Sequence, residues 1–213
     1  MNWRLPNQLT VARIVLAAAF FVLLGLYEPH TPWGRWMLNA AMALYILAGI
    51  TDVLDGYLAR RMKVETVFGR ITDPFVDKVL AVGAFAMLTG SNFILTGSEA
   101  LEHRLPGWLT GHMASAVQAW MVVVILAREF IVSGVRGYSE SRGVKFAATS
   151  AGKLKMFVQS FAICWVLCQL ANWPYDWAVI AKIALVWLAA LVTVLSGLAY
   201  VGRARQLFRT GTE

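Results

Sequence analysis

The feature that most limits how this chain can fold is a set of apolar stretches, each about 20 residues long, enough for a helix to cross a hydrocarbon core of about 30 Å. They predict about six membrane-spanning helices, at residues 8–27, 36–59, 75–96, 115–137, 153–171 and 177–200. Hydrophobic residues make up 59% of the chain and charged residues 15%, so lipid must be its main solvent. The fold class that follows is an all-α, polytopic membrane protein.

The segments between these stretches are short, which indicates a single membrane domain over residues 1–213. Residues 1–7 combine tryptophan, arginine and proline, a composition typical of a short interfacial segment lying on the membrane. The first apolar stretch is interrupted by Arg13 and lacks a small-residue cleavage site, which predicts a retained span rather than a signal peptide. The longest connection, residues 91–114, is rich in turn-forming residues and is expected to be an outer loop.

Two groups of residues are predicted to have structural roles. Cys164 and Cys168 lie four apart in an apolar stretch, a poor geometry for a disulfide, and are expected in the core. Several tryptophans cluster near the predicted outer ends of the spans, as an aromatic belt would; these are Trp33, Trp36, Trp108, Trp173 and Trp177.

Lysine and arginine are distributed unevenly between the two sides of the predicted bundle. If the spans alternate in direction, sixteen of the 19 basic residues fall on one side. They are Arg4, Arg13, Arg60, Arg61, Lys63, Arg70, Lys78, Arg128, Arg136, Arg142, Lys145, Lys153, Lys155, Arg203, Arg205 and Arg209. The positive-inside bias makes that side cytoplasmic, which predicts a cell-membrane protein with both termini in the cytoplasm. The net charge of +7 then suits anionic headgroups or phosphorylated substrates, and there is no soluble basic domain that would bind nucleic acid.

The segment 51–78 places four aspartates where two predicted helices approach the cytoplasmic face. Asp52 and Asp55 are three apart and share one face of the first helix. Asp73 and Asp77 are four apart and share one face of the second. Carboxylates gathered at membrane depth would repel each other, so one or two divalent cations are the natural way to hold them. An all-oxygen shell favours Mg²⁺ or Mn²⁺, with Ca²⁺ as a competitor.

Two structural interpretations of these aspartates stay open. Asp73 precedes Pro74, and an aspartate before a proline at the first helical position is a good N-cap. Asp52 and Asp55 can instead form a helix-end salt-bridge cluster with the two arginines that follow them. Small residues on the same helix faces favour a binding role, because they clear space for a bulky group.

The aspartates belong to a longer pattern, D-x2-D-G-x2-A-R-x8-G-x3-D-x3-D. Its fixed positions are Asp52, Asp55, Gly56, Ala59, Arg60, Gly69, Asp73 and Asp77. This pattern resembles the signature of the CDP-alcohol phosphatidyltransferases, and the six-span layout is similar to that family over nearly the whole chain. The resemblance implies an enzyme, a homodimer, that displaces CMP from a CDP-linked lipid with two bound metal ions.

The resemblance also implies a role for each matching position. The four aspartates would hold the metals and, through them, the CDP-lipid, and Asp77 would accept the proton of the attacking hydroxyl. Gly56, Ala59 and Gly69 would make room for the cytidine and ribose. Arg60 would lie near the diphosphate. Small residues of the third span would either open a sideways groove for the lipid tails or serve only in helix packing.

Three further stretches, 5–13, 127–136 and 152–155, resemble the branch of the family that uses glycerol 3-phosphate as acceptor. That reaction joins CDP-diacylglycerol to glycerol 3-phosphate and gives phosphatidylglycerophosphate and CMP. A phosphorylated acceptor needs a second anion site, for which the candidates are Arg128, Arg136, Lys153 and Lys155. The alternative is that these charges only set the topology.

Within that second site, Arg128 and Arg136 are expected on one helix face, with Glu129 pointing elsewhere and pairing locally. Asn7, Thr10 and Arg13 are candidates to line the same cavity, although Asn7 and Thr10 could equally cap the first span.

Rival functions remain for the same residues. Within the family, the acceptor could be inositol phosphate, serine or phosphatidylglycerol. An intramembrane prenyltransferase also binds a lipid diphosphate through aspartates, but its two motifs normally lie far apart in the chain. A cation transporter would predict acidic residues near mid-membrane on several spans and an internal repeat, and neither is visible in the sequence.

Overall fold

The computed structural model describes residues 4–62, 67–96, 100–141 and 150–210. Within these ranges, the side chains of residues 4–7, 55, 57–62, 67–74, 100, 140, 150–151 and 203–210 are not described. The described residues form six long helices: α1 (Arg4–Gly25), α2 (Gly34–Met62), α3 (Val67–Met87), α6 (Ala119–Ser141), α7 (Ser150–Asn172) and α8 (Asp176–Thr210). Three short elements lie between α3 and α6: η1 (Ser91–Phe93), α4 (Ala100–Arg104) and α5 (Gly107–Thr110).

The six long helices correspond to the six predicted spans, and the all-α fold class is confirmed. In the described part of the chain, four of them are long and apolar enough to cross a membrane; the qualifying segments are Gln8–Gly25, Gly34–Leu54, Gly152–Asn172 and Asp176–Gly202. The other two, α3 and α6, each carry four charged residues. The chain is therefore a multi-pass membrane protein.

Several predicted boundaries are wrong. The third span was expected to reach residue 96, but α3 ends at Met87, and the predicted outer loop contains the three short helical elements instead. The fourth span was expected from residue 115, but α6 begins at Ala119 because Ala116 adopts a left-handed backbone with a φ of 59°. From Arg4 onward, the predicted interfacial segment is part of the continuous helix α1, and the apolar segment of that helix begins at Gln8, as predicted. Proline is tolerated in a first helical turn, so Pro6 does not prevent this.

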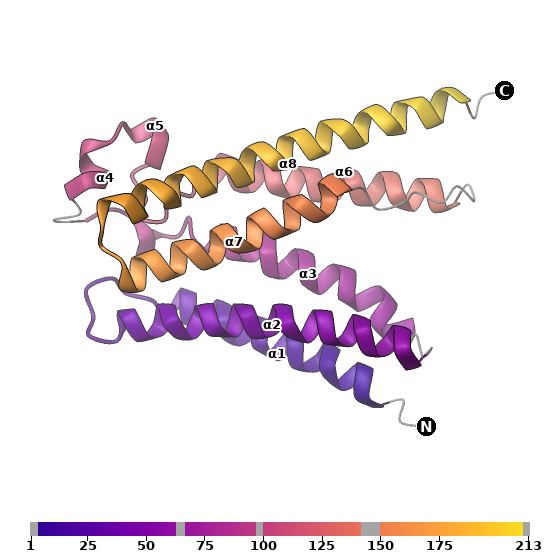
Figure 1. Ribbon diagram of the computed structural model, residues 1–213, viewed down its shortest axis with the longest axis horizontal. Helices are drawn as coiled ribbons and strands as arrows, with labels where there is room; N and C mark the ends of the chain where they lie inside the picture. The colour runs from indigo at the N-terminus through magenta and orange to yellow at the C-terminus, as the bar shows by residue number, and fades with distance from the viewer. Residues whose placement is uncertain (1–3, 63–66, 97–99, 142–149, 211–213) are drawn as a thin grey trace.

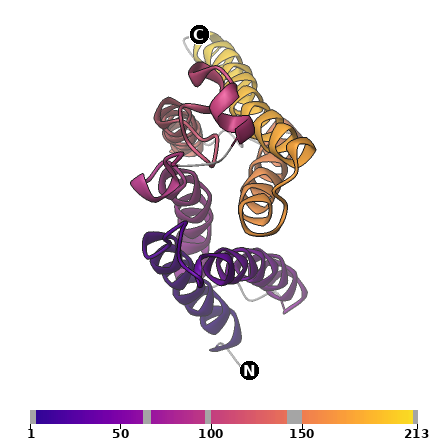
Figure 2. The same cartoon turned by 90° about the vertical axis from the view of Figure 1, so that its left-hand side faces the viewer.

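The helices run side by side, with their connections gathered at two ends of the bundle (Figure 1). The start of α1 and the end of α8 lie at one end, here named the terminal end. The short helices α4 and α5 lie at the opposite end, here named the loop end. Seen along the bundle, α1 and α2 form one group, α7 and α8 another, with α3 and α6 beside them (Figure 2). The arrangement agrees with predicted spans that alternate in direction.

The core is apolar and draws on all six long helices, through residues such as Phe20, Leu38, Phe85, Met121, Leu167 and Val186. Gly83 on α3 receives the ring of Phe21 from α1, because a Cβ atom there would lie 2.6 Å from Phe21 Cζ. At this position the small residue of the third span therefore serves helix packing. Cys164 and Cys168 are free thiols, and Cys164 packs against this core, as predicted.

The loop end is held by a buried ion pair, here named the loop-end pair. Lys182 near the start of α8 donates through Nζ to Glu102 of α4 and to the backbone oxygen of Ala114. The Lys182 side chain is fully buried and that of Glu102 almost so. Four of the five tryptophans predicted to form a belt, those at 33, 36, 108 and 177, are exposed.

Candidate active site

An acidic site lies where α1, α2 and α3 meet. Arg13 of α1 is completely buried, and its Nη1 atom lies 2.7 Å from Asp52 Oδ1 on α2 and 3.5 Å from Asp77 Oδ1 on α3. The two carboxylates remain partly exposed, at 36% and 29% of their side-chain surface. Since both oxygens contact one nitrogen atom, they are close to each other. The predicted convergence of these two helices on one spot is therefore confirmed for Asp52 and Asp77.

Arg13 is the partner that the sequence did not identify. It was a candidate only for cavity lining, although an arginine inside an apolar span has to be paired and so points to a nearby acid. Thr10, one turn earlier, is also fully buried. The alternative that Asn7 and Thr10 cap the first span is wrong, because α1 begins at Arg4 and both lie within it.

The other motif positions are placed by their backbone. Asp55, Ala59 and Arg60 lie in α2, and Gly69 and Asp73 lie in α3, but their side chains are outside the described residues. Gly56 is partly exposed on α2. The helical backbone puts Asp55 one turn from Asp52, and Asp73 one turn from Asp77, so the shared faces stand as predicted.

The N-cap interpretation of Asp73 is wrong. Helix α3 begins at Val67 and continues through Asp73 and Pro74. A proline inside a helix has no N–H to donate to the carbonyl four residues earlier, which costs about 3 kcal/mol. The helix includes the proline in spite of this cost.

The donor chemistry of the acidic site fits a hard divalent cation. Asp52 and Asp77 supply carboxylate oxygens from two helices, the type of ligand that Mg²⁺ and Mn²⁺ prefer. Among the described side chains no group of three or more histidine, cysteine, aspartate or glutamate residues occurs, and those of Asp55 and Asp73 are not among them.

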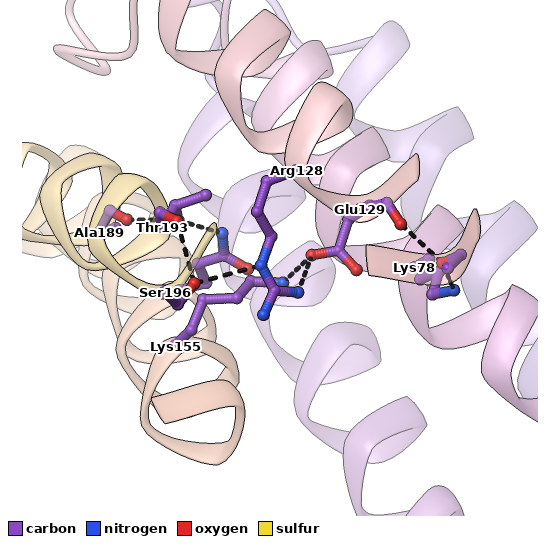
Figure 3. Close-up of polar contacts among 9 residues, drawn as sticks. Lys78, Arg128, Glu129, Lys155, Ala189, Thr193 and Ser196 are labelled. Atoms are coloured by element: carbon purple, nitrogen blue, oxygen red, sulfur yellow. Dashed lines mark hydrogen bonds and ion pairs between the residues drawn. The ribbon is translucent and has the colours of Figure 1, made fainter. Parts of the chain in front are cut away.

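A second site, here named the basic cluster, joins α6, α7 and α8 (Figure 3). It consists of Arg128, Glu129 and Lys155, all buried. Glu129 Oε1 accepts a hydrogen bond of 3.0 Å from Arg128 Nη1 and another from Lys155 Nζ. Arg128 Nε donates to Ser196 Oγ of α8 at 3.1 Å. Two of the four predicted acceptor-site cations are thus brought together.

For Glu129, the expected local pairing is confirmed by its contact with Arg128, but the expected direction of its side chain is wrong. It was expected to point away from the basic residues, but its Oε1 atom accepts from both Arg128 and Lys155 (Figure 3). A buried carboxylate needs a charged partner, and here the partners come from its own helix and from α7.

The expectation that Arg128 and Arg136 share a helix face is also wrong. Arg128 is buried and Arg136 is exposed. Eight residues correspond to two turns plus a rotation of about 80°, enough to turn the second side chain away from the core. Lys153 is exposed as well, two residues before the buried Lys155 on α7.

Helices α3 and α6 connect the acidic site to the basic cluster. Lys78, the neighbour of Asp77 on α3, donates from Nζ to Ser133 Oγ on α6 at 2.5 Å. Ser133 Oγ in turn donates to the backbone oxygen of Glu129 at 2.6 Å. The helices that carry Asp77 and Arg128 are therefore joined by a direct hydrogen bond between Lys78 and Ser133.

These features define a class of protein: a multi-pass helical membrane protein with carboxylates suited to divalent cations beside buried cations suited to an anion. A comparison with known families names it more closely. The family model described as CDP-alcohol phosphatidyltransferase matches residues 3–195. The chain belongs to the CDP-alcohol phosphatidyltransferase family and is a transferase. This membership decides against the prenyltransferase and cation-transporter alternatives.

Several curated proteins are similar to this chain over nearly its whole length. One from Bacillus subtilis is 32% identical over 222 residues, which cover 98% of this chain and 98% of the relative. One from Escherichia coli K12 is 34% identical over 207 residues, covering 96% of this chain and 97% of the relative. One from Cereibacter sphaeroides is 36% identical over 166 residues, covering 76% of this chain and 62% of the relative. Each is named CDP-diacylglycerol–glycerol-3-phosphate 3-phosphatidyltransferase.

Proposed function

We propose that this protein transfers the phosphatidyl group of CDP-diacylglycerol to glycerol 3-phosphate, with release of CMP. The observation that carries the proposal is the near full-length similarity to relatives that are named for this reaction. The basic cluster supports the acceptor, because two buried cations against one carboxylate suit an alcohol that bears its own phosphate. Serine, a zwitterion with no phosphate, would not require so many cations.

In the proposed reaction, a hydroxyl oxygen of glycerol 3-phosphate forms a bond to the phosphatidyl phosphorus. The bond from that phosphorus to the oxygen shared with CMP breaks, and CMP leaves with the bonding electrons. Asp77 takes the hydroxyl proton, and Arg128 and Lys155 bind the acceptor phosphate. The exposed side chains of Arg136 and Lys153 attract the negatively charged acceptor from the solvent but do not bind its phosphate directly.

The nucleotide end of the lipid is assigned to the motif residues. Asp52, Asp55, Asp73 and Asp77 would hold two Mg²⁺ or Mn²⁺ ions, which when bound neutralise charge on the diphosphate and on the leaving CMP. Arg60 lies near the diphosphate, and the small residues Gly56, Ala59 and Gly69 leave room for the cytidine and ribose. The buried side chain of Arg13 contacts both Asp52 and Asp77 and holds the two carboxylates close together.

We further propose that the terminal end of the bundle faces the cytoplasm of a cell membrane, because sixteen of the 19 basic residues belong to that side. The family resemblance suggests a homodimer. Size-exclusion chromatography with light scattering in detergent tests the dimer, and a monomer would contradict it.

The reaction is tested by measuring CMP release from CDP-diacylglycerol by the reconstituted protein. Release is expected with glycerol 3-phosphate in Mg²⁺ or Mn²⁺, and is expected to stop when EDTA removes the metal. Serine, inositol phosphate and phosphatidylglycerol are tested as alternative acceptors. Release with one of these and not with glycerol 3-phosphate would refute the acceptor and leave the family membership intact.

The role of Asp77 is tested by Asp77→Asn, which keeps the shape of the side chain and removes its charge. Turnover is expected to fall by about 10³-fold or more, because a metal ligand and the proton acceptor are lost together. Asp176→Asn is the matched control, since Asp176 is an exposed aspartate at the loop end. Near-normal activity of a folded Asp77→Asn variant would remove its proposed role.

A further inference from the structure

Residues in the later part of α8 contact Arg128, and the sequence motifs gave no reason to expect these contacts. Ser196 Oγ accepts from Arg128 Nε at 3.1 Å. The Arg128 guanidinium carbon lies 5.4 Å from the centre of the Tyr200 ring. Between them, a Cβ atom at Gly197 would lie 3.2 Å from Arg128 Cγ, closer than an ordinary contact. All three positions lie beyond residue 195, where the family match ends.

These contacts fix the guanidinium on most of its sides. Ser196 accepts a hydrogen bond from Nε and Glu129 accepts one from Nη1, while the Tyr200 ring lies over one face of the guanidinium. Within the described part of the chain, Arg128 Nη2 makes no hydrogen bond. A guanidinium is a rigid planar fork, so fixing two nitrogens and one face also fixes the direction of the third nitrogen.

Ser196 is itself held in place. Its hydroxyl donates to the backbone oxygen of Thr193 at 2.9 Å, which leaves its oxygen lone pairs to accept from Arg128. Thr193 Oγ1 donates to the backbone oxygen of Ala189 at 2.6 Å and accepts from Gln159 of α7 at 2.9 Å. The chain of hydrogen bonds gives Ser196 a single orientation, and it is visible in Figure 3 on the α8 side of the cluster.

We propose that Ser196, Gly197 and Tyr200 are positioning residues, which set acceptor specificity by aiming Arg128 Nη2 at the phosphate of the acceptor. The proposal rests on the proposed function. Ser196 aligns the guanidinium plane, and Tyr200 supports it from one face. Gly197 allows α8 to approach closely enough for both contacts. A side chain at 197 would push Arg128 away and misdirect Nη2.

The test compares two glycine substitutions on the same helix. Gly197→Ala is expected to raise the KM for glycerol 3-phosphate about 5-fold, because a displaced guanidinium loses about 1 kcal/mol of a charged hydrogen bond. The KM for CDP-diacylglycerol is expected to stay within about twofold, because that substrate binds at the acidic site. Gly202→Ala is the matched control, since a Cβ atom there meets nothing within 4 Å.

Tyr200 gives a second readout. Tyr200→Leu removes the ring and is expected to raise the KM for glycerol 3-phosphate about 5-fold, the scale of a cation–π contact of about 1 kcal/mol. Tyr200→Phe keeps the ring and is expected to recover most of that loss. A residue that only packs helices would show no such recovery specific to one substrate. Ser196→Ala replaces Gly197→Ala in the test if the glycine variant does not fold.

The KM values of these variants either support or overturn the proposed positioning role. A rise in the KM for glycerol 3-phosphate alone, in the variants at 197 and 200 but not at 202, supports the proposal. Unchanged KM values, or equal rises for both substrates, overturn it. If the unmodified protein makes no product from glycerol 3-phosphate, the proposed function fails first. That failure is seen without any variant, so the two ideas are tested separately.

Discussion

Two buried lysine–glutamate contacts lie in different parts of this bundle, and they differ in how their charges balance. In the loop-end pair, one cation, Lys182, contacts the carboxylate of Glu102 and a backbone oxygen. In the basic cluster, Lys155 and Arg128 share the single carboxylate of Glu129, which leaves one positive charge in excess. A buried charge without a partner is costly. The loop-end pair therefore serves structure, and the basic cluster, with two cations on one carboxylate, keeps the capacity to bind an anion.

The largest expected effect is on stability at the loop end. Lys182→Met leaves Glu102 buried without its cation, and this should lower the free energy of unfolding by about 3–5 kcal/mol. Chemical unfolding in detergent measures it. Glu102→Gln added to Lys182→Met should recover more than half of the loss, because no charge then stays buried. A Lys182→Met variant as stable as the unmodified protein would contradict the structural role.

The equivalent substitution in the basic cluster should act mainly on activity. Lys155→Met is expected to lower kcat/KM for glycerol 3-phosphate about 100-fold, the effect of losing about 3 kcal/mol from a charged contact to the acceptor. The loss of stability should be smaller than for Lys182→Met, because Arg128 still neutralises Glu129. Steady-state kinetics and unfolding of the same two variants give the comparison. The reverse order of effects would contradict the assignment of the two clusters.

Removing the carboxylate of Glu129, which Arg128 and Lys155 share, should test whether the basic cluster binds an anion. Glu129→Gln leaves Arg128 and Lys155 to repel each other, which should cost about 1–3 kcal/mol of stability in the absence of acceptor. Glycerol 3-phosphate should then raise the Tm more than it does in the unmodified protein, because its phosphate supplies the missing negative charge. Thermal unfolding with and without the acceptor tests this, and an equal or smaller shift would count against an anion site.

The smallest effects are expected at the exposed cations near the cluster. Arg136→Ala and Lys153→Ala should each change kcat/KM for glycerol 3-phosphate less than about fivefold, since exposed charges contribute under about 1 kcal/mol. Raising the salt concentration should reduce even that difference. A loss as large as that of Lys155→Met would place these residues in the acceptor site itself.

The parts of the site that the sequence predicted are those that local spacing determines. Asp52 and Asp77 were expected to converge because helical periodicity puts each motif on one face, and both contact Arg13. Arg13 and Glu129 were misjudged, because the partners of Arg13 and one partner of Glu129, Lys155, lie on other helices. Arg13 is 64 residues from Asp77, and Glu129 is 26 residues from Lys155. No pattern of local spacing reports such a pairing.

The sequence by itself determined the six long helices and the shared faces of the aspartates, because the length of an apolar run and the helical repeat are local properties. The tertiary structure decided which buried charges meet. Arg128 contacts Ser196 at a separation of 68 residues, and Lys182 contacts Glu102 at a separation of 80. In a membrane interior the cost of a buried charge is relieved only by a partner that packing brings beside it.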